Sequence, residues 1–369
     1  MRNQQNNQDL TVLLLLKDRA KFTKRWIEYT KKINSPFKIL IADGGKEEEN
    51  QEIFSNKEGA SGIDSEYIRY PFDKDAITFR QKVADALSRI KTPFVVLASN
   101  DDFYFTEGLM KATEFLKNNN DYVSARGEIY SFSIKDRGDV WGKITNIYPL
   151  YTYPSVNDDS SLKRAETFSK GFHSIWHEVF RTKNLEHVYK TACQIGITDL
   201  ELSSHFIYLC IAALGKVHRD RDSLFMLHQS SSGSTGVNVL KESPFDKILE
   251  DSWPENFRKL TNTLAGKIAE IDNLPLEKTQ DKVAQYYLSN ILCQRVVAGY
   301  LERKILNKPS TIITLSHIFN KNNPLRKYIK KMYLDSKKQI RELKNKKTIK
   351  NSPLQKELKF IEDFLKNAK

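Results

Sequence analysis

The sequence has no long apolar stretch and only three cysteines. A membrane-spanning helix needs about 20 consecutive apolar residues, and no run approaches that length. The apolar run 11–16 also lacks the flanks and cleavage site of a signal peptide, so we expect a cytoplasmic protein. Cys193, Cys210 and Cys293 are widely spaced and form no CxxC pair. This spacing argues against a disulfide framework and against a structural zinc site.

An excess of charge is also missing from most of the chain, although the formal net charge is +13. Residues 301–369 contain 19 Lys and Arg against 6 Asp and Glu, which accounts for the whole excess. Two interpretations fit this basic segment: a surface that contacts anionic lipid headgroups at the inner face of a membrane, or a solvated helical appendage or oligomerisation arm. No nucleic-acid-binding fingerprint accompanies the charge, and we expect no nucleic-acid partner.

The chain does contain the material for a large core, with 40% hydrophobic and 11% aromatic residues in 369. Short apolar runs that are typical of buried strands alternate with helical patterns. Strands are predicted at 11–16, 37–42, 67–70, 94–98 and 223–227, and helices at 76–90, 107–116, 199–214 and 278–306. This alternation predicts an α/β fold with a mainly parallel sheet and helices on both faces.

The pattern also suggests how the chain is divided. Residues 1–9 are polar and predict a flexible tail, and residues 10–236 form the expected α/β domain, which ends in a Ser/Gly-rich loop at 230–236. Residues 237–369 predict a helical C-terminal region, strongly basic from about 301. Ser352, Pro353 and Gln355 have the pattern of a helix start.

Acidic residues follow two of the predicted strands, at the sheet edge where open α/β folds bind ligands. Asp43 comes after the second strand, and Asp101 and Asp102 come after the strand 94–98. Neighbouring carboxylates repel each other unless a cation or hydrogen bonds compensate, and Mg²⁺ or Mn²⁺ uses such carboxylates together with phosphate oxygens. The alternative is that Asp101 and Asp102 only cap the next helix.

These segments resemble the family-2-type glycosyltransferases, which have the GT-A (Rossmann-like) fold. The resemblance rests on Ile39–Gly45 (ILIADGG), Lys82–Phe103 (KVADALSRIKTPFVVLASNDDF) and Thr198–Ser203 (TDLELS). It covers roughly residues 10–230 and is nearest to a bacterial subgroup with an Asp-rich "DDDF"-like motif. Asn100 stands where that motif has its first aspartate.

The resemblance implies a set of donor-binding residues and a metal site. Asp43 would face the nucleobase of a nucleotide-sugar, and Asp101 and Asp102 would match the DxD-type element that contacts the ribose and a Mn²⁺ or Mg²⁺ ion. His228 would be a further metal ligand. The other donor-binding candidates are Arg19, Lys82 and Asn100. Each has a plainer interpretation: Asp43 as a turn residue and His228 as an ordinary loop or core histidine.

On the acceptor side, the resemblance makes Asp199 the general base of an inverting reaction, with Glu201 as the second candidate. The plainer interpretation is an acidic pair favoured by the helix dipole. His173, Trp176 and His177 lie where the family builds its acceptor pocket. Trp176 is a candidate stacking platform for a sugar ring, or simply a core residue.

The resemblance therefore implies an inverting, metal-dependent glycosyltransferase of hexosyltransferase type. It would move a sugar from a nucleotide-diphosphate donor, most plausibly a UDP-sugar, to a glycan or lipid-linked acceptor in bacterial surface polysaccharide synthesis. A degenerate donor-binding or membrane-docking subunit is the alternative. A sugar-nucleotide pyrophosphorylase is disfavoured, because no Gly-rich, Arg-containing loop follows the first strand.

Overall fold

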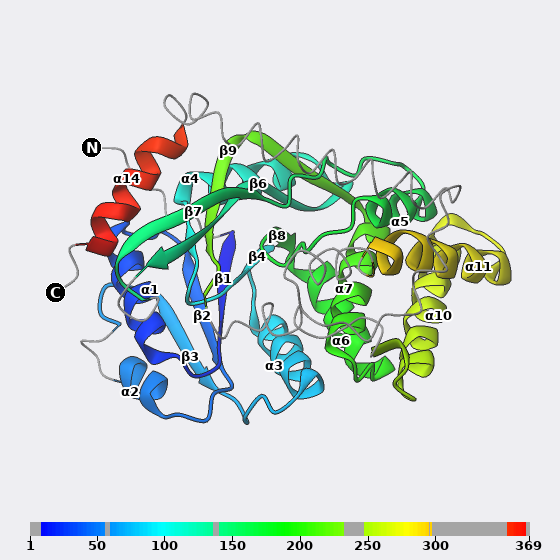
Figure 1. Cartoon of the computed structure of the whole chain (residues 1–369), viewed down its shortest axis with the longest axis horizontal. Coiled ribbons are helices and arrows are strands. Elements are labelled where there is room, and N and C mark those ends of the chain that lie inside the picture. The colour runs from blue at the N-terminus through cyan, green and yellow to red at the C-terminus, as the bar shows by residue number, and fades with distance from the viewer. Residues whose placement is uncertain are drawn as a thin grey trace, which may run out of the picture.

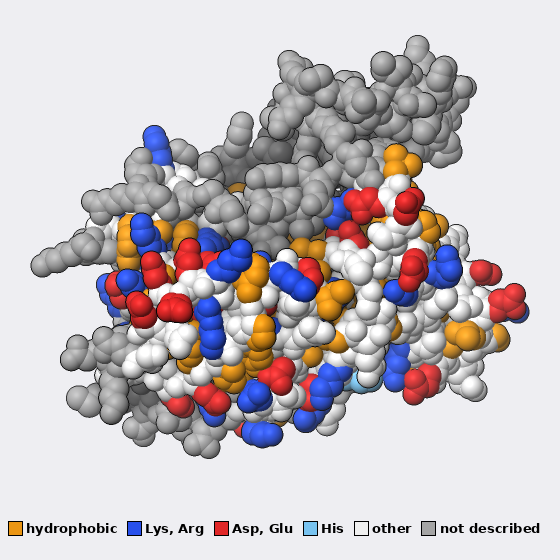
Figure 2. Space-filling model, turned by 90° about the horizontal axis from the view of Figure 1, so that it is seen from below, with side chains coloured by type: hydrophobic (Ala, Val, Ile, Leu, Met, Phe, Trp, Pro, Cys, Tyr) orange, Lys and Arg blue, Asp and Glu red, His pale blue; other side chains and the backbone are white. Residues whose placement is uncertain are grey.

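The computed structural model describes residues 9–55, 60–135, 140–231, 247–294, 296 and 353–366. A nine-stranded sheet runs through the centre, with helices packed against it (Figure 1). Most of the basic segment 301–369, the tail 1–8 and the loop 232–236 lie outside the described residues. On the face seen in Figure 2, acidic and basic side chains are interspersed over the described surface.

The first four strands of the sheet are parallel, in the order β3-β2-β1-β4. They are β1 (Leu10–Leu16), β2 (Lys38–Asp43), β3 (Ser65–Arg69) and β4 (Phe94–Ala98). The connecting helices are α1 (Ala20–Lys32), α2 (Glu49–Ser55) and α3 (Ala76–Arg89). The four strands and α3 lie close to their predicted positions, whereas α2 was not predicted, and the predicted α/β fold class is confirmed.

The second half of the sheet is mixed and less apparent in the sequence. β8 (Val179–Arg181) pairs antiparallel with both β4 and β6 (Tyr122–Lys135), and β6 pairs parallel with β9 (Lys216–Gln229). β5 (Phe103–Tyr104) and β7 (Lys143–Leu150) pair antiparallel with β9 and β6. The predicted short strand at 223–227 is therefore the end of a much longer one.

Side chains of β1, β2 and β4 alternate between two cores, as expected for strands covered on both faces. Leu13, Leu40 and Val95 face the helices α3, α5 (Ser161–Lys170), α6 (Thr182–Ile195) and α7 (Leu200–Leu214). Leu14 and Val96 face α1 and α4 (Thr106–Asn118).

The C-terminal helices pack against both ends of this body. α10 (Trp253–Asp272), α11 (Leu276–Tyr286) and the π-helical turn η2 (Tyr287–Leu292) contribute Leu260, Val283 and Ile291 to the core that contains α7. The predicted helix 278–306 is described only to residue 294 and at 296, and in that part its winding changes at Tyr287. No helix in the described part of the chain is long and apolar enough to cross a membrane.

The last helix, α14 (Pro353–Lys366), lies at the opposite end of the sheet (Figure 1). Its buried side chains, Leu358, Ile361, Phe364 and Leu365, share a cluster with residues of α1, β5, β6, β7 and β9. Phe364 packs edge-on against Tyr29 and Phe103. The apolar stripe of this helix is therefore covered by the protein itself.

Candidate active site

Strand pairing brings Asp102 and His228 together from positions 126 residues apart. After β4 the chain turns and enters β5, where Phe103 pairs with Leu227 of antiparallel β9. In an antiparallel pair, the residue before one member lies opposite the residue after the other. Asp102 consequently faces His228, and the distance from Asp102 Oδ1 to His228 Nδ1 is 2.9 Å.

A second histidine completes a cluster around Asp102. His177 precedes β8, the strand that pairs beside β4, and its Nδ1 lies 3.7 Å from Asp102 Oδ2. One ligand atom of each of the three residues lies within 4.8 Å of the other two. This is the one group of three or more potential metal ligands found within the described ranges.

The Asp102 carboxylate is buried and only partly satisfied. Oδ1 contacts His228 and accepts a hydrogen bond from the Gln229 N–H at 3.1 Å, but Oδ2 accepts no hydrogen bond from any described residue. Burial raises the pKa of Asp102, although the charge of His228 opposes the shift. A buried carboxylate oxygen without a donor is costly, and a divalent cation would satisfy it.

The pKa values of the two histidines shift in opposite directions. Burial holds the pKa of His177 well below its ordinary value, so its ring is neutral and keeps a lone pair for a metal. Burial also lowers the pKa of His228, but the charge and hydrogen bond of Asp102 outweigh it, and the net shift is upward. One carboxylate with two imidazoles suits Mn²⁺ or a similar divalent ion, so the residues present fit a metal.

Asp101 points away from this cluster. Its Oδ2 accepts hydrogen bonds from Arg19 Nη1 at 3.1 Å and from the Ser231 hydroxyl at 2.6 Å. Arg19 also donates to Ser231, at 2.8 Å. The structure thus places Arg19 beside Asp101, while the roles of both residues in donor binding, and of Asp101 as a metal ligand, stay predictions.

Asn100 has a structural partner on the opposite side of the turn. Its amide nitrogen donates to the Thr23 hydroxyl at 3.0 Å and lies 3.4 Å from the Arg19 carbonyl oxygen. An aspartate has no N–H to donate here. The departure from the Asp-rich motif therefore has a local reason, which is that this side chain ties the turn to α1.

The other two donor-side candidates are Asp43, at the end of β2, and Lys82, within α3. Asp43 is fully buried, and its oxygens accept hydrogen bonds from Gly45 N at 2.9 Å, Tyr67 Oη at 2.8 Å and Arg69 Nη1 at 2.7 Å. Lys82 is buried and pairs with Asp73, and it donates to the Leu16 carbonyl oxygen at 2.9 Å. Both residues thus have protein partners, and their contact with a donor stays a prediction.

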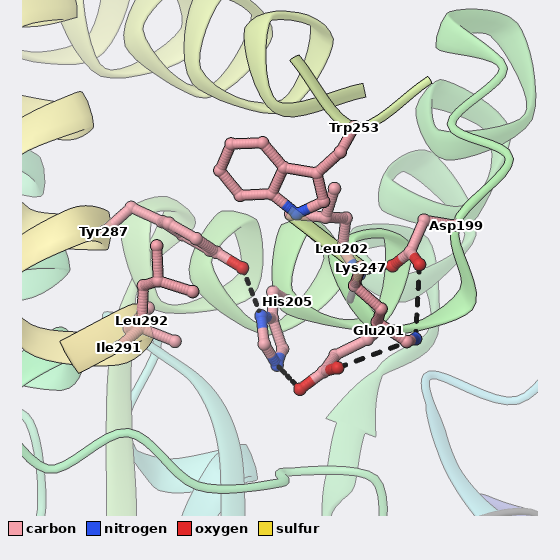
Figure 3. Close-up of a pocket in the computed structure, with 9 residues that line it drawn as sticks. All are labelled: Asp199, Glu201, Leu202, His205, Lys247, Trp253, Tyr287, Ile291 and Leu292. Carbon is pink, nitrogen blue, oxygen red and sulfur yellow. Dashed lines mark hydrogen bonds and ion pairs between the residues drawn. The ribbon is translucent and has the colours of Figure 1, made fainter. Parts of the chain in front are cut away.

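Asp199 and Glu201 lie together at the start of α7 (Figure 3). Asp199 is the N-cap: its Oδ1 accepts the Leu202 N–H at 2.6 Å, so the helix-terminal interpretation of this residue is correct. Its Oδ2 lies 3.3 Å from Lys247 Nζ, and Glu201 Oε2 lies 3.7 Å from the same ammonium group. A cap and a base are compatible, because only Oδ1 is used by the helix.

The predicted acceptor residues are partly or wholly committed to packing. Trp176 stacks on Phe79, with ring centroids 5.9 Å apart. His173 is buried against Tyr153, at 4.9 Å, and its Nδ1 lies 2.8 Å from the Gly171 carbonyl oxygen. His177, which sequence reasoning grouped with them, belongs instead to the Asp102 cluster.

Comparison with known proteins finds distantly similar solved structures but no matching family. No family model matches this chain, and neither does any curated protein. Residues 1–349 of TarS from S. aureus are similar with a TM-score of 0.49 and 12% identity, covering 82% of this chain and 76% of that chain. The complex of TarS 1–349 with UDP-GlcNAc gives a TM-score of 0.46 at 11% identity, with 87% and 78% covered.

Another similar structure is the mannosyltransferase PcManGT from Pyrobaculum calidifontis in complex with GDP-Man and Mn²⁺. It has a TM-score of 0.42 and 11% identity, with 87% of this chain and 83% of that chain covered. At TM-scores below 0.5, these likenesses assign no role to any residue of this chain.

Proposed function

We propose that this protein is a glycosyltransferase that uses a nucleotide-sugar donor and a divalent metal ion, Mn²⁺ or Mg²⁺. The observation that carries the proposal is the Asp102–His177–His228 cluster, which lies beyond the carboxyl end of β4, at the edge where β1 and β2 also end. This is where open α/β sheets bind nucleotides. The motifs Ile39–Gly45 and Lys82–Phe103 support the same class.

In this proposal, Asp102, His177 and His228 would hold the metal ion, which would supply positive charge to the diphosphate leaving group. Arg19 adds a positive charge at the same edge, oriented by Asp101 and Ser231. Asp43 contacts the nucleobase, held in place by Tyr67 and Arg69. The donor is a UDP-sugar or another nucleoside-diphosphate sugar.

Transfer proceeds with inversion, and Asp199 is the base. Its Oδ1 is occupied by the helix cap, so Oδ2 accepts the proton of the acceptor hydroxyl. The acceptor oxygen bonds to the anomeric carbon as the bond from that carbon to the diphosphate oxygen breaks. Glu201, beside the same lysine, is the second candidate for this role.

The acceptor in this proposal is a glycan or lipid-linked sugar of a bacterial surface polysaccharide, and the enzyme works at the cytoplasmic side. The apolar stripe of α14 packs on the sheet. Any contact with anionic lipid would therefore use basic side chains rather than insertion of this helix.

The proposal is tested by incubating the protein with a panel of nucleotide-sugars, with and without Mn²⁺ or Mg²⁺, and measuring released nucleoside diphosphate. We expect metal-dependent release from one donor, lost in Asp102→Asn. Asn262→Asp, a surface change on α10, is the matched control. Absence of release and of any donor-induced thermal shift across the panel would contradict the proposal.

A further inference from the structure

Arg80, on α3, carries a buried side chain that is only 2% exposed. Its Nη1 donates to the Ser203 hydroxyl at 2.5 Å, and its Nη2 donates to the Ile197 carbonyl oxygen. Within the described ranges, Arg80 forms no ion pair with a carboxylate, and its buried Nε has no acceptor. A buried cation without a counter-charge costs free energy that an apolar side chain of similar size would not. Stability alone therefore does not explain an arginine at this position.

The two oxygen atoms that Arg80 contacts belong to residues on either side of Asp199. Ile197 lies two residues before this N-cap, and Ser203 lies four residues after it, one turn into α7. The backbone N–H of Ser203 also donates to the Asp199 carbonyl oxygen at 3.1 Å. The guanidinium group therefore ties the chain that enters the helix to the first turn of the helix, with Asp199 between the two contacts.

The residue between Ile197 and Asp199 is held from another helix. The Thr198 N–H donates to Asn256 Oδ1 on α10 at 3.0 Å, and Asn256 Nδ2 donates to the Thr198 hydroxyl at 2.9 Å. Asp199 Oδ1 in turn accepts the Leu202 N–H. The backbone around Asp199 thus has fixed partners, and Oδ2 is the oxygen proposed above as the base.

α3 connects this segment to the sheet edge where the donor is proposed to bind. The helix packs against α6 and also against β1 and β2 (Figure 1). Two residues after Arg80, Lys82 donates at 2.9 Å to the carbonyl oxygen of Leu16, at the end of β1, and pairs with buried Asp73. A single helix therefore holds both this edge and the segment that carries Asp199.

We infer that Arg80 is a positioning residue for the base, because its guanidinium group fixes the orientation of Asp199 relative to the donor. The inference rests on the proposed function, in which Asp199 Oδ2 accepts a proton. A guanidinium presents several N–H groups in a fixed planar fork, whereas a lysine presents one ammonium group on a flexible stem. Arg80→Lys therefore keeps the positive charge but weakens the hold on Ile197 and Ser203.

The first measurement is amide hydrogen exchange, which needs no substrate. The N–H groups of Leu202 and Ser203 donate to Asp199, so their exchange rates report how firmly the cap is held. In Arg80→Lys we expect about tenfold faster exchange at these two amides, which corresponds to about 1.4 kcal/mol and lies within the usual range for an N-cap. Exchange in β4 should not change. Arg89→Lys makes the same replacement at an exposed position of α3 and should exchange as the wild type.

The second measurement is the release of nucleoside diphosphate from UDP-glucose, UDP-N-acetylglucosamine and GDP-mannose, with Mn²⁺ and no added acceptor. Water then replaces the acceptor hydroxyl: its oxygen bonds to the anomeric carbon, Asp199 takes its proton, and the diphosphate leaves. In Arg80→Lys we expect kcat to fall by about 100-fold, the lower end of what a general base contributes. The KM for the donor and the affinity for Mn²⁺ should stay within about twofold, because Arg80 contacts neither.

Ser203→Ala provides a milder test that leaves the buried arginine in place. It removes one of the two oxygen atoms that Arg80 contacts, and we expect kcat to fall by about tenfold with the same KM. Melting temperatures of both variants show whether they fold. A loss of kcat in Ser203→Ala supports the inference even if Arg80→Lys does not fold, and wild-type kcat in Ser203→Ala would then contradict it.

The double variant Arg80→Lys/Asp199→Asn distinguishes positioning from a merely structural role. If Arg80 acts through Asp199, the double variant is as slow as Asp199→Asn alone. A further loss in the double variant, wild-type kcat in Arg80→Lys, or wild-type exchange at Leu202 and Ser203 would overturn the inference. Faster exchange in Arg80→Lys, together with a wild type that releases no diphosphate, would contradict the proposed function and leave the hold of Arg80 on this segment standing.

Discussion

Replacing Asn100 with aspartate would complete the Asp-rich motif that the sequence resembles, and the structure predicts that this change is harmful. Asn100 is 5% exposed, and its amide donates to Thr23 and faces the Arg19 carbonyl oxygen. In Asn100→Asp, the hydroxyl of Thr23 can turn to donate, but the Arg19 carbonyl faces a carboxylate. The new charge also lies next in sequence to the buried Asp101 and Asp102.

The expected cost is worked from these two effects. An unsatisfied buried acceptor costs about 1–3 kcal/mol, and a further buried carboxylate beside two others adds to it. We expect the free energy of unfolding to fall by about 2–4 kcal/mol, and the affinity for Mn²⁺ to stay unchanged, because the side chain is directed toward α1 and not toward His177 or His228.

Urea denaturation followed by circular dichroism measures the stability, and Mn²⁺ titration by electron paramagnetic resonance measures the affinity. Asn262→Asp is the matched control: its side-chain oxygen accepts from Gln280 at 3.3 Å on an exposed part of α10, so a carboxylate can replace it within about 0.5 kcal/mol. An Asn100→Asp variant that is as stable as the wild type and binds Mn²⁺ more tightly would refute the reasoning.

Three further predictions follow from the described contacts. Asp102→Asn should weaken Mn²⁺ binding by about 100-fold or more in calorimetric titration. The melting temperature of the metal-free protein should stay equal or rise, because a buried charge is removed. A lower melting temperature with unchanged Mn²⁺ affinity would contradict this prediction. Ile361→Ala should cost about 2–5 kcal/mol of unfolding free energy, since Ile361 is fully buried between α14 and the sheet; a cost below about 1 kcal/mol in urea denaturation would show that α14 is not docked. Burial lowers the pKa of His173 to about 3. Between about pH 6.5 and 3 the imidazole is therefore protonated in the unfolded chain but not in the folded one. The free energy of unfolding should fall as the pH drops through this range, by up to about 1.4 kcal/mol per pH unit. The comparison is with His173→Phe, whose melting temperature should change less over that range; identical pH profiles would refute the assignment.

β1, β2 and β4 in the parallel half of the sheet were predictable because these strands are buried on both faces. Runs such as Thr11–Leu16 and Phe94–Ala98 are continuous and apolar, and their positions are correct to within about a residue. β6 was not predicted, because its 14 residues mix Arg126 and Glu128 with aromatics, and their partners Glu178 and Arg219 come from distant segments. Ion pairs formed across a sheet leave no local pattern in the sequence.

The residues of the candidate site also fall into two groups, those that the sequence predicted and those that it did not. Asp102 was a candidate because of its place after a strand, and His228 because of the family resemblance. The pairing of β5 with β9 brings them together. The role of His177 was missed, because it depends on β8 inserting antiparallel beside β4, which no local signal in three residues reveals. The contact of Lys247 with Asp199 was also missed, since the two residues are 48 positions apart in the sequence.

The docking of α14 has a consequence for the order in which the molecule is completed during synthesis. Phe103 and Leu227 lie in the cluster that α14 covers, and each is the neighbour in sequence of a metal-cluster residue, Asp102 or His228. A ribosome translates α14 after every other described element. Until that helix has been translated, Phe103 and Leu227 lack the packing of its apolar side chains. The strands that carry the candidate cluster therefore gain their packing against α14 only after that helix has been translated.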